Sequence, residues 1–126
     1  MTSQKLSKRL PTDDLSMITH AISPKLKRLA LGCEHGNIMI YDLETHERVG
    51  TLKAQKPDVL SLLFVTPERL IVGQVEGYID IIKFVGNQAH ITHSLQISEA
   101  GDINQLVDTG KERELMIGCA KGLLLC

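Results

Sequence analysis

The chain has 126 residues, of which 43% are hydrophobic and 23% charged, the size and composition of a single globular domain. Its 14 Lys and Arg against 15 Asp and Glu leave a formal net charge of −1, so no overall field holds nucleic acid or an anionic membrane, and either would need a local patch. The strongly apolar runs, such as 62–65 and 123–125, fall far short of the roughly 20 residues that span a bilayer. We expect a cytosolic or nuclear protein, because the basic N-terminus lacks the apolar segment of a secretory signal.

The cysteines do not form a recognisable framework. Cys33, Cys119 and Cys126 are odd in number and lack CxxC spacing, and the chain contains no Asn-x-Ser/Thr acceptor. We therefore expect free thiols that act as small buried hydrophobic side chains.

The predicted elements follow a polar N-terminal tail, residues 1–13, and are strands throughout. Apolar stretches bounded by turn residues run in chain order at 17–22, within 28–36, at 37–41, at 48–52, at 59–65, within 69–77, at 78–82, at 90–97, within 114–122 and at 123–125. Several are apolar at nearly every position, which is typical of sheets covered on both faces. The stretch 111–119 could be mistaken for a helix, but Gly110 and Gly118 bracket it and favour a loop and strand.

A repeated pattern links these strands. Three segments, 28–36, 69–77 and 114–122, each consist of a short apolar run, a glycine, three residues and a second glycine. The spacings between copies are 41 and 45 residues, which matches one four-stranded repeat unit. We interpret the glycines as structural turn residues that accept a positive φ at little cost: Gly32 and Gly36, Gly73 and Gly77, Gly118 and Gly122.

Residues 22–46 closely resemble a WD-repeat unit of a β-propeller, with Tyr41-Asp42 in the place of the Trp-Asp signature. The second repeat resembles it less, with Ile82-Lys83 at that place. The resemblance covers about residues 14–126 and implies an all-β fold, a partial β-propeller of about two and a half four-stranded antiparallel blades. The implied units are a first repeat at 14–53, a second at 54–98 and a truncated third at 99–126.

The repeats also depart from the family pattern. The Gly-His dipeptide before a blade is absent, with Ala54-Gln55 near its place, and the turn Asp is replaced by His35, Glu76 and Lys121. The departures predict that the family's buried hydrogen-bond network is lost and that apolar packing, at about 25 cal/mol per Å² buried, mainly holds the blades.

A propeller ring typically closes with 4 to 8 blades, more than this chain supplies. Met1 looks like a natural start and Cys126 falls within a strand, so we expect an N-terminal fragment or truncated gene product whose remaining blades come in cis or from another chain. Alone, its uncovered blade face and strand edges should promote aggregation.

Catalytic and cofactor motifs are missing from the sequence. No phosphate-binding loop is present, because Gly110-Lys111 is followed by Glu112, and no serine sits in a Gly-x-Ser-x-Gly elbow. His90 and His93 would point to opposite faces of a strand unless a bulge intervenes, and we interpret His20 as a hydrogen-bonded core histidine. We predict no enzyme activity, no cofactor and no metal site.

The resemblance instead implies partner binding on the turns between the second and third strands and on the loops entering the next blade. The candidate residues are Glu34, His35, Glu76 and Lys121, beside loops 53–58 and 99–102. We therefore expect a non-enzymatic scaffold for protein–protein interaction, without nucleic acid or a transmembrane segment. Two alternatives remain: the propeller of a vesicle-tethering or coat subunit, and an accessory propeller of an enzyme whose catalytic part lies elsewhere.

Overall fold

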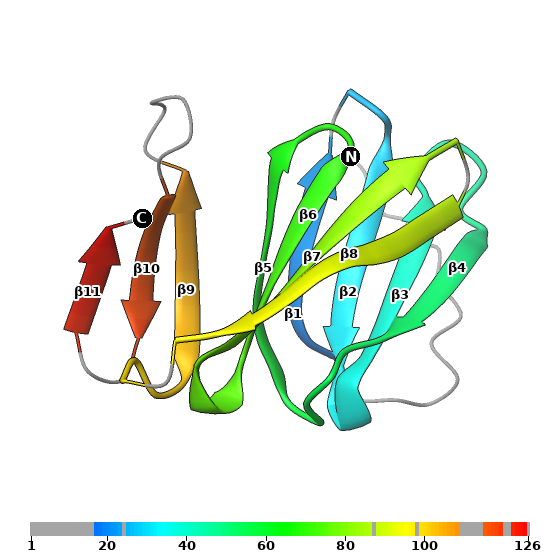
Figure 1. Cartoon of the computed structure of the whole chain (residues 1–126). Coiled ribbons are helices and arrows are strands. Elements are labelled where there is room, and N and C mark those ends of the chain that lie inside the picture. Colours follow the sequence, from blue (N-terminus) through cyan, green and yellow to red (C-terminus); the bar gives the residue numbers. More distant parts are fainter. Residues whose placement is uncertain are drawn as a thin grey trace, which may run out of the picture.

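The computed structural model describes residues 17–23, 25–86, 88–97, 99–108, 115–119 and 122–125. These residues form three antiparallel sheets in which strands adjacent in sequence pair with one another (Figure 1). The first sheet contains β1 (Met17–Ser23), β2 (Arg28–Cys33), β3 (Asn37–Asp42) and β4 (Arg48–Lys53); the second contains β5 (Val59–Thr66), β6 (Arg69–Gln74), β7 (Tyr78–Val85) and β8 (Gln88–Gln96); the third contains β9 (Ile103–Asp108), β10 (Leu115–Cys119) and β11 (Gly122–Leu125).

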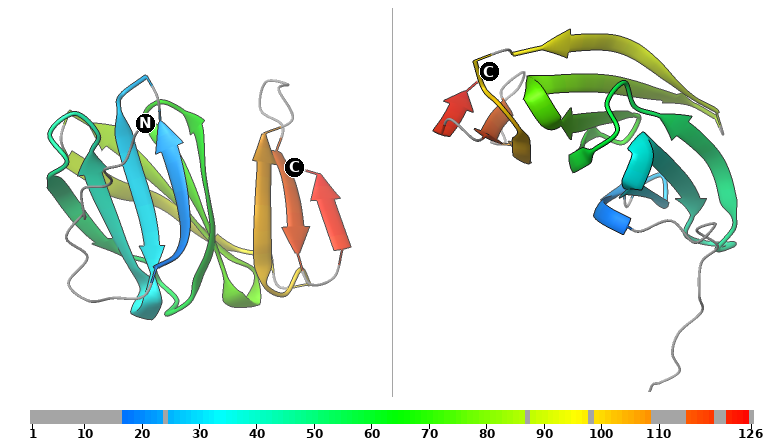
Figure 2. Two further views of the ribbon diagram at one scale, coloured as in Figure 1. Left: turned by 180° about the vertical axis from the view of Figure 1, so that it is seen from behind. Right: turned by 90° about the horizontal axis from the view of Figure 1, so that it is seen from below.

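The sheets stand side by side as blades, with their first strands β1, β5 and β9 in contact along one side (Figure 2). The expected all-β partial propeller is confirmed. In the described part of the chain the helical elements are two single 3₁₀ turns, η1 (Glu34–Gly36) and η2 (Val75–Gly77), and none is long and apolar enough to cross a membrane. The sequence pattern predicted a strand shorter than β7, and it did not predict β9.

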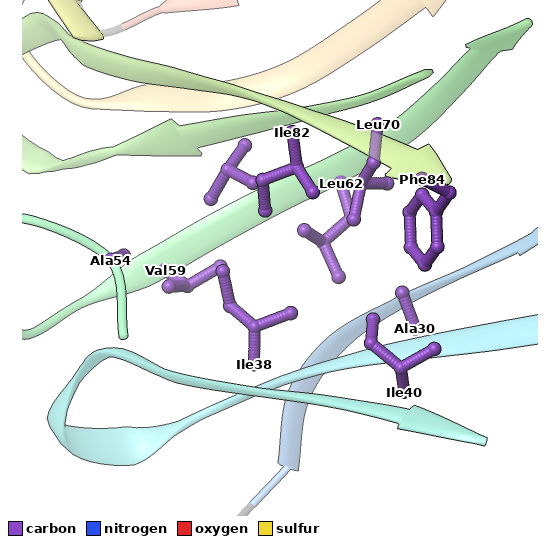
Figure 3. Packing of buried hydrophobic residues seen from close by; sticks show 10 residues of the cluster. Ala30, Ile38, Ile40, Ala54, Val59, Leu62, Leu70, Ile82 and Phe84 are labelled. Atoms are coloured by element: carbon purple, nitrogen blue, oxygen red, sulfur yellow. The ribbon is translucent and has the colours of Figure 1, made fainter. Parts of the chain in front are cut away.

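The interface between the first and second sheets is the main apolar core (Figure 3). Strand alternation aims every second side chain of β2 and β3 at the second sheet, and these meet the corresponding side chains of β5, β6 and β7. The buried members of this cluster are Ala30, Ile38, Ile40, Ala54, Val59, Leu62, Leu70, Val72, Ile82 and Phe84. Because both sheets contribute, each blade stabilises its neighbour by removing apolar surface from water.

The second and third sheets approach so closely that no side chain fits at one point of β6. A Cβ added at Gly73 would lie 2.5 Å from Cγ2 of Ile103 and would also collide with Oγ of Ser61. Gly32 has the equivalent place in the first sheet, where an added Cβ would lie 2.7 Å from Cγ1 of Val59. Gly32, Gly73 and Gly118 therefore lie inside strands rather than in turns, and the first two permit close packing of blades.

Hydrogen bonds supplement the apolar contacts between blades. Ser23 Oγ donates to the carbonyl of Pro67 at 3.3 Å, and Ser61 Oγ donates to the carbonyl of Ile103 at 2.9 Å. Both serines are buried. Each bond runs from the first strand of one sheet to a residue of another unit, so it adds direction to an otherwise non-directional contact.

The first sheet's other face carries a separate cluster of Leu29, Leu31, Cys33, Met39 and Tyr41. The last four of these are at most 6% exposed. Among the described residues of this face, the exposed large apolar side chains lie on β1, where Ile18 and Ile22 are 44% and 50% exposed. Elsewhere in the described part of the chain, Val107 of β9 is 46% exposed, so uncovered apolar surface is found on the third sheet as well.

His20 lies on this same face of β1, opposite Leu31, and is exposed. The interpretation of His20 as a core histidine is therefore wrong. Strand alternation directs Ala21, not His20, toward the main core.

Candidate functional site

The turns η1 and η2 share one backbone design. In η1 the φ angles of His35 and Gly36 are +65° and +77°; in η2 those of Glu76 and Gly77 are +60° and +79°. The amide after each turn, from Asn37 or Tyr78, donates to the carbonyl that opens it. Two successive positive φ values closed by such a bond define a type I′ turn, whose central residues are favourably Asn-Gly, Asp-Gly or Gly-Gly.

His35 and Glu76 are the unusual residues of these turns. Each occupies the first central position, where a positive φ is unfavourable for most L-residues, although His tolerates it better than Glu does. Their side chains are 70% and 65% exposed. Both turns therefore present a long polar side chain to solvent at a backbone position that suits Asn or Gly better.

The loop entering the next blade packs against each turn. Gly36 accepts a hydrogen bond at 2.8 Å from the amide of Ala54, and Gly77 accepts one at 2.8 Å from the amide of Ile97. A side chain at Gly36 would come within 2.6 Å of the carbonyl of Lys56. Each turn and the following loop therefore form one rigid surface element.

These elements gather at one end of the molecule, the lower end in Figure 1. We call this surface the turn face and define it as residues 34–36, 53–58, 75–77, 97 and 99–102. Lys56 ties the loop entering the second blade to the turn of that blade: its Nζ lies 3.3 Å from Oε1 of Glu76 and 4.6 Å from the ring centre of Tyr78. The amide of Glu76 also donates to Oδ1 of Asp102 at 3.1 Å.

The turn face is predominantly acidic. Its lysines are Lys53 and Lys56, and Nε2 of His35 lies 3.1 Å from Oε2 of Glu34. The carboxylates outnumber them: Glu34, Asp58, Glu76, Glu99 and Asp102. A surface with this excess attracts a cationic partner through the summed field of its charges.

A buried polar network holds the entering loop of the second blade. Asp80, fully buried, accepts hydrogen bonds from the amide of Gln55 at 3.1 Å, from Nε2 of Gln55 at 2.7 Å and from Oγ of Ser94 at 2.7 Å. Oε1 of the equally buried Gln74 accepts the amide of Lys56 at 2.9 Å. The loop is thus fixed by hydrogen bonds to two buried side chains, Asp80 and Gln74.

This network corrects the expectation that the second blade lacks a buried hydrogen-bond network, while the expected apolar packing between the blades is present. The polar support is present, but it uses a carboxylate in the middle of β7 instead of one in the turn. Gln55 stands where the family pattern expects His. An aspartate within an apolar strand was a signal that sequence reasoning passed over, because a buried charge needs such partners.

The structure brings Glu34, His35 and Glu76 onto the turn face, together with loops 53–58 and 99–102. Lys121 lies outside the described residues, as do Ala120, Pro24 and Cys126. Gly122, which opens β11, has a φ of +123°, but an added Cβ there would meet nothing within 4 Å.

The two histidines of β8 lie on one face of their strand. His93 pairs with Ile81 and His90 pairs with Lys83, with a register irregularity between Ile81 and Ile82 that accommodates one extra residue. This bulge is the exception that the sequence expectation named, and it places both histidines on one face. Across the described ranges, however, no group of three or more His, Cys, Asp or Glu residues could hold a metal ion.

Cys33 offers little reactivity. Cys33, directly before η1, is free and buried, and Cys119 is free and half-buried. Burial, followed by the charge of Glu34, raises the pKa of the Cys33 thiol, which therefore stays protonated and unreactive at neutral pH.

Solved structures with the same arrangement of blades are β-propellers or parts of them. Sqt1 of Chaetomium thermophilum, bound to the N-terminus of the ribosomal protein L10, superposes with a TM-score of 0.73 and 22% identity over 86% of this chain and 32% of its own. Sqt1 of Saccharomyces cerevisiae superposes with a TM-score of 0.68 and 18% identity over 90% of this chain and 32% of its own. The β-propeller domain of Cps50 (Swd1) of Myceliophteria thermophila superposes with a TM-score of 0.71 and 13% identity over 86% of this chain and 35% of its own.

The chain thus spans about a third of the length of each of these structures. At these identities the likeness establishes the fold alone. No family model matches the chain, and the comparison with curated proteins found no significant relative.

Proposed function

We propose that the protein is a non-enzymatic scaffold of the WD-repeat kind and that its turn face binds a protein partner. The observation that carries the proposal is the pair of exposed side chains, His35 and Glu76, on type I′ turns whose backbone suits smaller residues. A hairpin optimised for stability alone would place Asn or Gly there. Unfavourable backbone conformations that persist in a rigid setting are typical of functional positions.

The chemistry of the turn face favours a basic segment as the partner. The carboxylates of Glu34, Glu76 and Asp102 are exposed or half-buried on rigid turns, and the buried Asp80 network keeps the intervening loop in place. A rigid surface binds with less ordering cost than a mobile one. The L10 N-terminus bound by the Sqt1 neighbour supports a peptide segment as the kind of ligand.

The repeats proposed for this scaffold are residues 14–53, 54–98 and 99–126. A ring of 4 to 8 blades would draw its remaining blades from the same polypeptide or from another chain, and the one-third coverage of the similar structures supports that arrangement. We place the scaffold in the cytosol or nucleus, where free thiols such as Cys33 and Cys119 stay reduced.

The test is a binding comparison in which only the position of a reversed charge differs. A protein recovered with the chain is purified, and its affinity is measured for the wild type, for Glu76→Lys and for Glu47→Lys. Glu47 is exposed in the hairpin between β3 and β4, away from the turn face, and is the matched control.

We expect Glu76→Lys to weaken binding at least tenfold and Glu47→Lys to leave it within about twofold, since a charge contact at an interface is worth on the order of 1.5–3 kcal/mol. Equal affinities for the two variants would show that the partner binds elsewhere and would refute the proposal.

A further inference from the structure

One cation of the turn face lies between a carboxylate and an aromatic ring. Nζ of Lys56 is 3.3 Å from Oε1 of Glu76 and 4.6 Å from the ring centre of Tyr78. This combination binds cations in general, because the carboxylate attracts the charge and accepts its hydrogen bonds while the ring face adds a cation–π contact. We call Glu76 and Tyr78 the cation site.

The cation site does not depend on Lys56 for its backbone. The amide of Glu76 donates to Oδ1 of Asp102 at 3.1 Å, and its carbonyl accepts from Nε2 of Gln96 at 3.0 Å. Tyr78 opens β7, where it pairs with Gln96, and its amide donates to the carbonyl of Val75. Both members of the site therefore start from fixed backbone, so a ligand that binds them needs little ordering of the protein.

Lys56 is held firmly at its backbone and weakly at its tip. Its amide donates to Oε1 of the buried Gln74 at 2.9 Å, and its carbonyl lies against Gly36 of the first blade. The side chains of Lys56 and Glu76 are 31% and 65% exposed, and exposed ion pairs are weak because water screens the charges and two long side chains lose freedom. The flexible stem of lysine can therefore carry the ammonium out of the site while the loop stays in place.

The chemistry of the site favours a guanidinium over the ammonium that now occupies it. Glu76 and the neighbouring Asp102 bring two carboxylates, against the single ammonium of Lys56. A guanidinium is planar, stacks on an aromatic ring, forms paired hydrogen bonds with a carboxylate and is more weakly hydrated than an ammonium. An incoming arginine therefore has an advantage over Lys56 at this site.

The first blade offers no equivalent site. Asn37 follows η1 at the place where Tyr78 follows η2, and its side chain has no aromatic face. His35 occupies the place of Glu76, so the first turn presents an imidazole where the second presents a carboxylate. A preference for arginine should therefore arise at the second blade.

Building on the proposed function of the turn face, we propose that Lys56 is an intramolecular competitor that occupies the cation site until an arginine of the partner displaces it. The guanidinium stacks on Tyr78 and binds Glu76, while the ammonium of Lys56 moves into solvent. A segment that offers only lysines exchanges one ammonium for another and gains little. The cation site thus selects arginine, and Lys56 sets the affinity that the partner must exceed.

The experiment measures the binding of two fluorescein-labelled heptapeptides to the full chain by fluorescence anisotropy. One peptide alternates Gly and Arg, and the other alternates Gly and Lys. The variants are Lys56→Met, which removes the ammonium and keeps an apolar stem; Lys53→Met, which removes the same charge from the exposed end of β4; and Tyr78→Leu, which removes the ring. A melting curve of each variant establishes that it is folded.

We expect the wild type to bind the Gly-Arg peptide at least threefold more tightly than the Gly-Lys peptide, and Tyr78→Leu to abolish this preference. Lys56→Met should raise the affinity for the Gly-Arg peptide at least fivefold. Lys53→Met should raise it twofold at most, because it removes a charge from the turn face but frees no site.

Nuclear magnetic resonance of the Lys56 side chain detects the displacement itself. The ring of Tyr78 should shield the ε-methylene protons of Lys56 in the free chain, since Nζ lies over the ring. These protons should move to their ordinary chemical shift when the Gly-Arg peptide binds.

Three results would overturn the inference: equal effects of Lys56→Met and Lys53→Met, equal affinities of the wild type for the two peptides, or Lys56 protons that stay shielded while the Gly-Arg peptide is bound. Each of them leaves the proposed function standing if Glu76→Lys still weakens peptide binding. Binding that Glu76→Lys does not change, or no binding of either peptide, would overturn both.

Discussion

Replacing Gly73 by alanine tests how tightly the second and third blades are packed. The new Cβ would lie 2.5 Å from Cγ2 of Ile103, whereas carbon atoms at optimal contact are about 3.5–4.0 Å apart. β9 must therefore move away from β6 by roughly 1 Å. That movement would stretch the 2.9 Å bond from Ser61 Oγ to the Ile103 carbonyl beyond hydrogen-bonding distance.

The free energy cost follows from these two changes. Overpacking a well-packed site costs about 1–3 kcal/mol, and the lost hydrogen bond adds about 1 kcal/mol. Alanine recovers about 0.4–1 kcal/mol by restricting the unfolded chain. The net destabilisation should be about 1–3 kcal/mol, which lowers the melting temperature of a chain this long by about 5–10 °C.

Thermal unfolding followed by circular dichroism measures this change, with Gly50→Ala as the control. Gly50 lies in β4, where an added Cβ has its nearest neighbour, Cβ of Ile40, at 4.0 Å, so this variant should be neutral within about 0.5 kcal/mol. Adding Ile103→Ala should relieve part of the Gly73→Ala cost and leave a positive coupling between the two sites. The reasoning is refuted if Gly73→Ala has the same melting temperature as Gly50→Ala.

Three further predictions concern the turns and the buried network. Glu76→Asn should stabilise the chain by about 0.5–1 kcal/mol in urea unfolding because Asn tolerates a positive φ, and a loss of stability would contradict the assignment of the turn. Asp80→Ala should cost about 1–3 kcal/mol because it removes the buried carboxylate that accepts three hydrogen bonds, whereas Asp80→Asn should cost about half as much; equal and small effects would mean the network is dispensable. Backbone hydrogen bonds from Glu44 and Thr45 lower the pKa of Asp42 below 3.8. The contribution of Asp42 to stability is therefore present above that pH and is lost as the pH falls through the lowered pKa. Asp42→Asn should flatten the acid side of the stability–pH curve, and an unchanged slope would count against this role of Asp42.

Much of the fold was predictable because the repeated glycine pairs report a local geometry. Gly36 and Gly77 occupy turns with a positive φ, and Gly32 and Gly73 occupy contacts too close for a side chain. A pair of glycines that satisfies these two requirements recurs once per blade, so the spacing between pairs gives the number of residues in a blade. Apolar runs such as 59–65 predicted buried strands for the same reason, since both of their faces are covered.

The buried network was less accessible to sequence reasoning. Asp80 and Gln55 are 25 residues apart, and Ser94 lies a further 14 beyond Asp80, so no local pattern joins them. Their proximity follows from the pairing of β7 with β8 and from the docking of the entering loop. Long-range contacts of this kind depend on tertiary structure, which periodicity does not encode.

The placement of His93 depended on a single irregularity. A regular strand would send His90 and His93 to opposite faces, and nothing in the composition of 88–96 indicates a bulge. The extra residue of β8 opposite Ile81 and Ile82 brings His93 to the face that carries Arg69, Lys83 and His90. The charge pattern of this face therefore emerges only from the register of the pairing.

The account is tested most directly by mapping a basic ligand on the isotope-labelled chain by nuclear magnetic resonance. A lysine- and arginine-rich peptide is titrated while backbone amide shifts are followed. The proposal predicts concentration-dependent shifts at residues 34–36, 53–58, 75–77 and 99–102, and their reduction in Glu76→Lys. Shifts confined to the opposite end, at residues 25–27 and 43–47, or no shifts at all, would contradict the turn face as the binding surface of this scaffold.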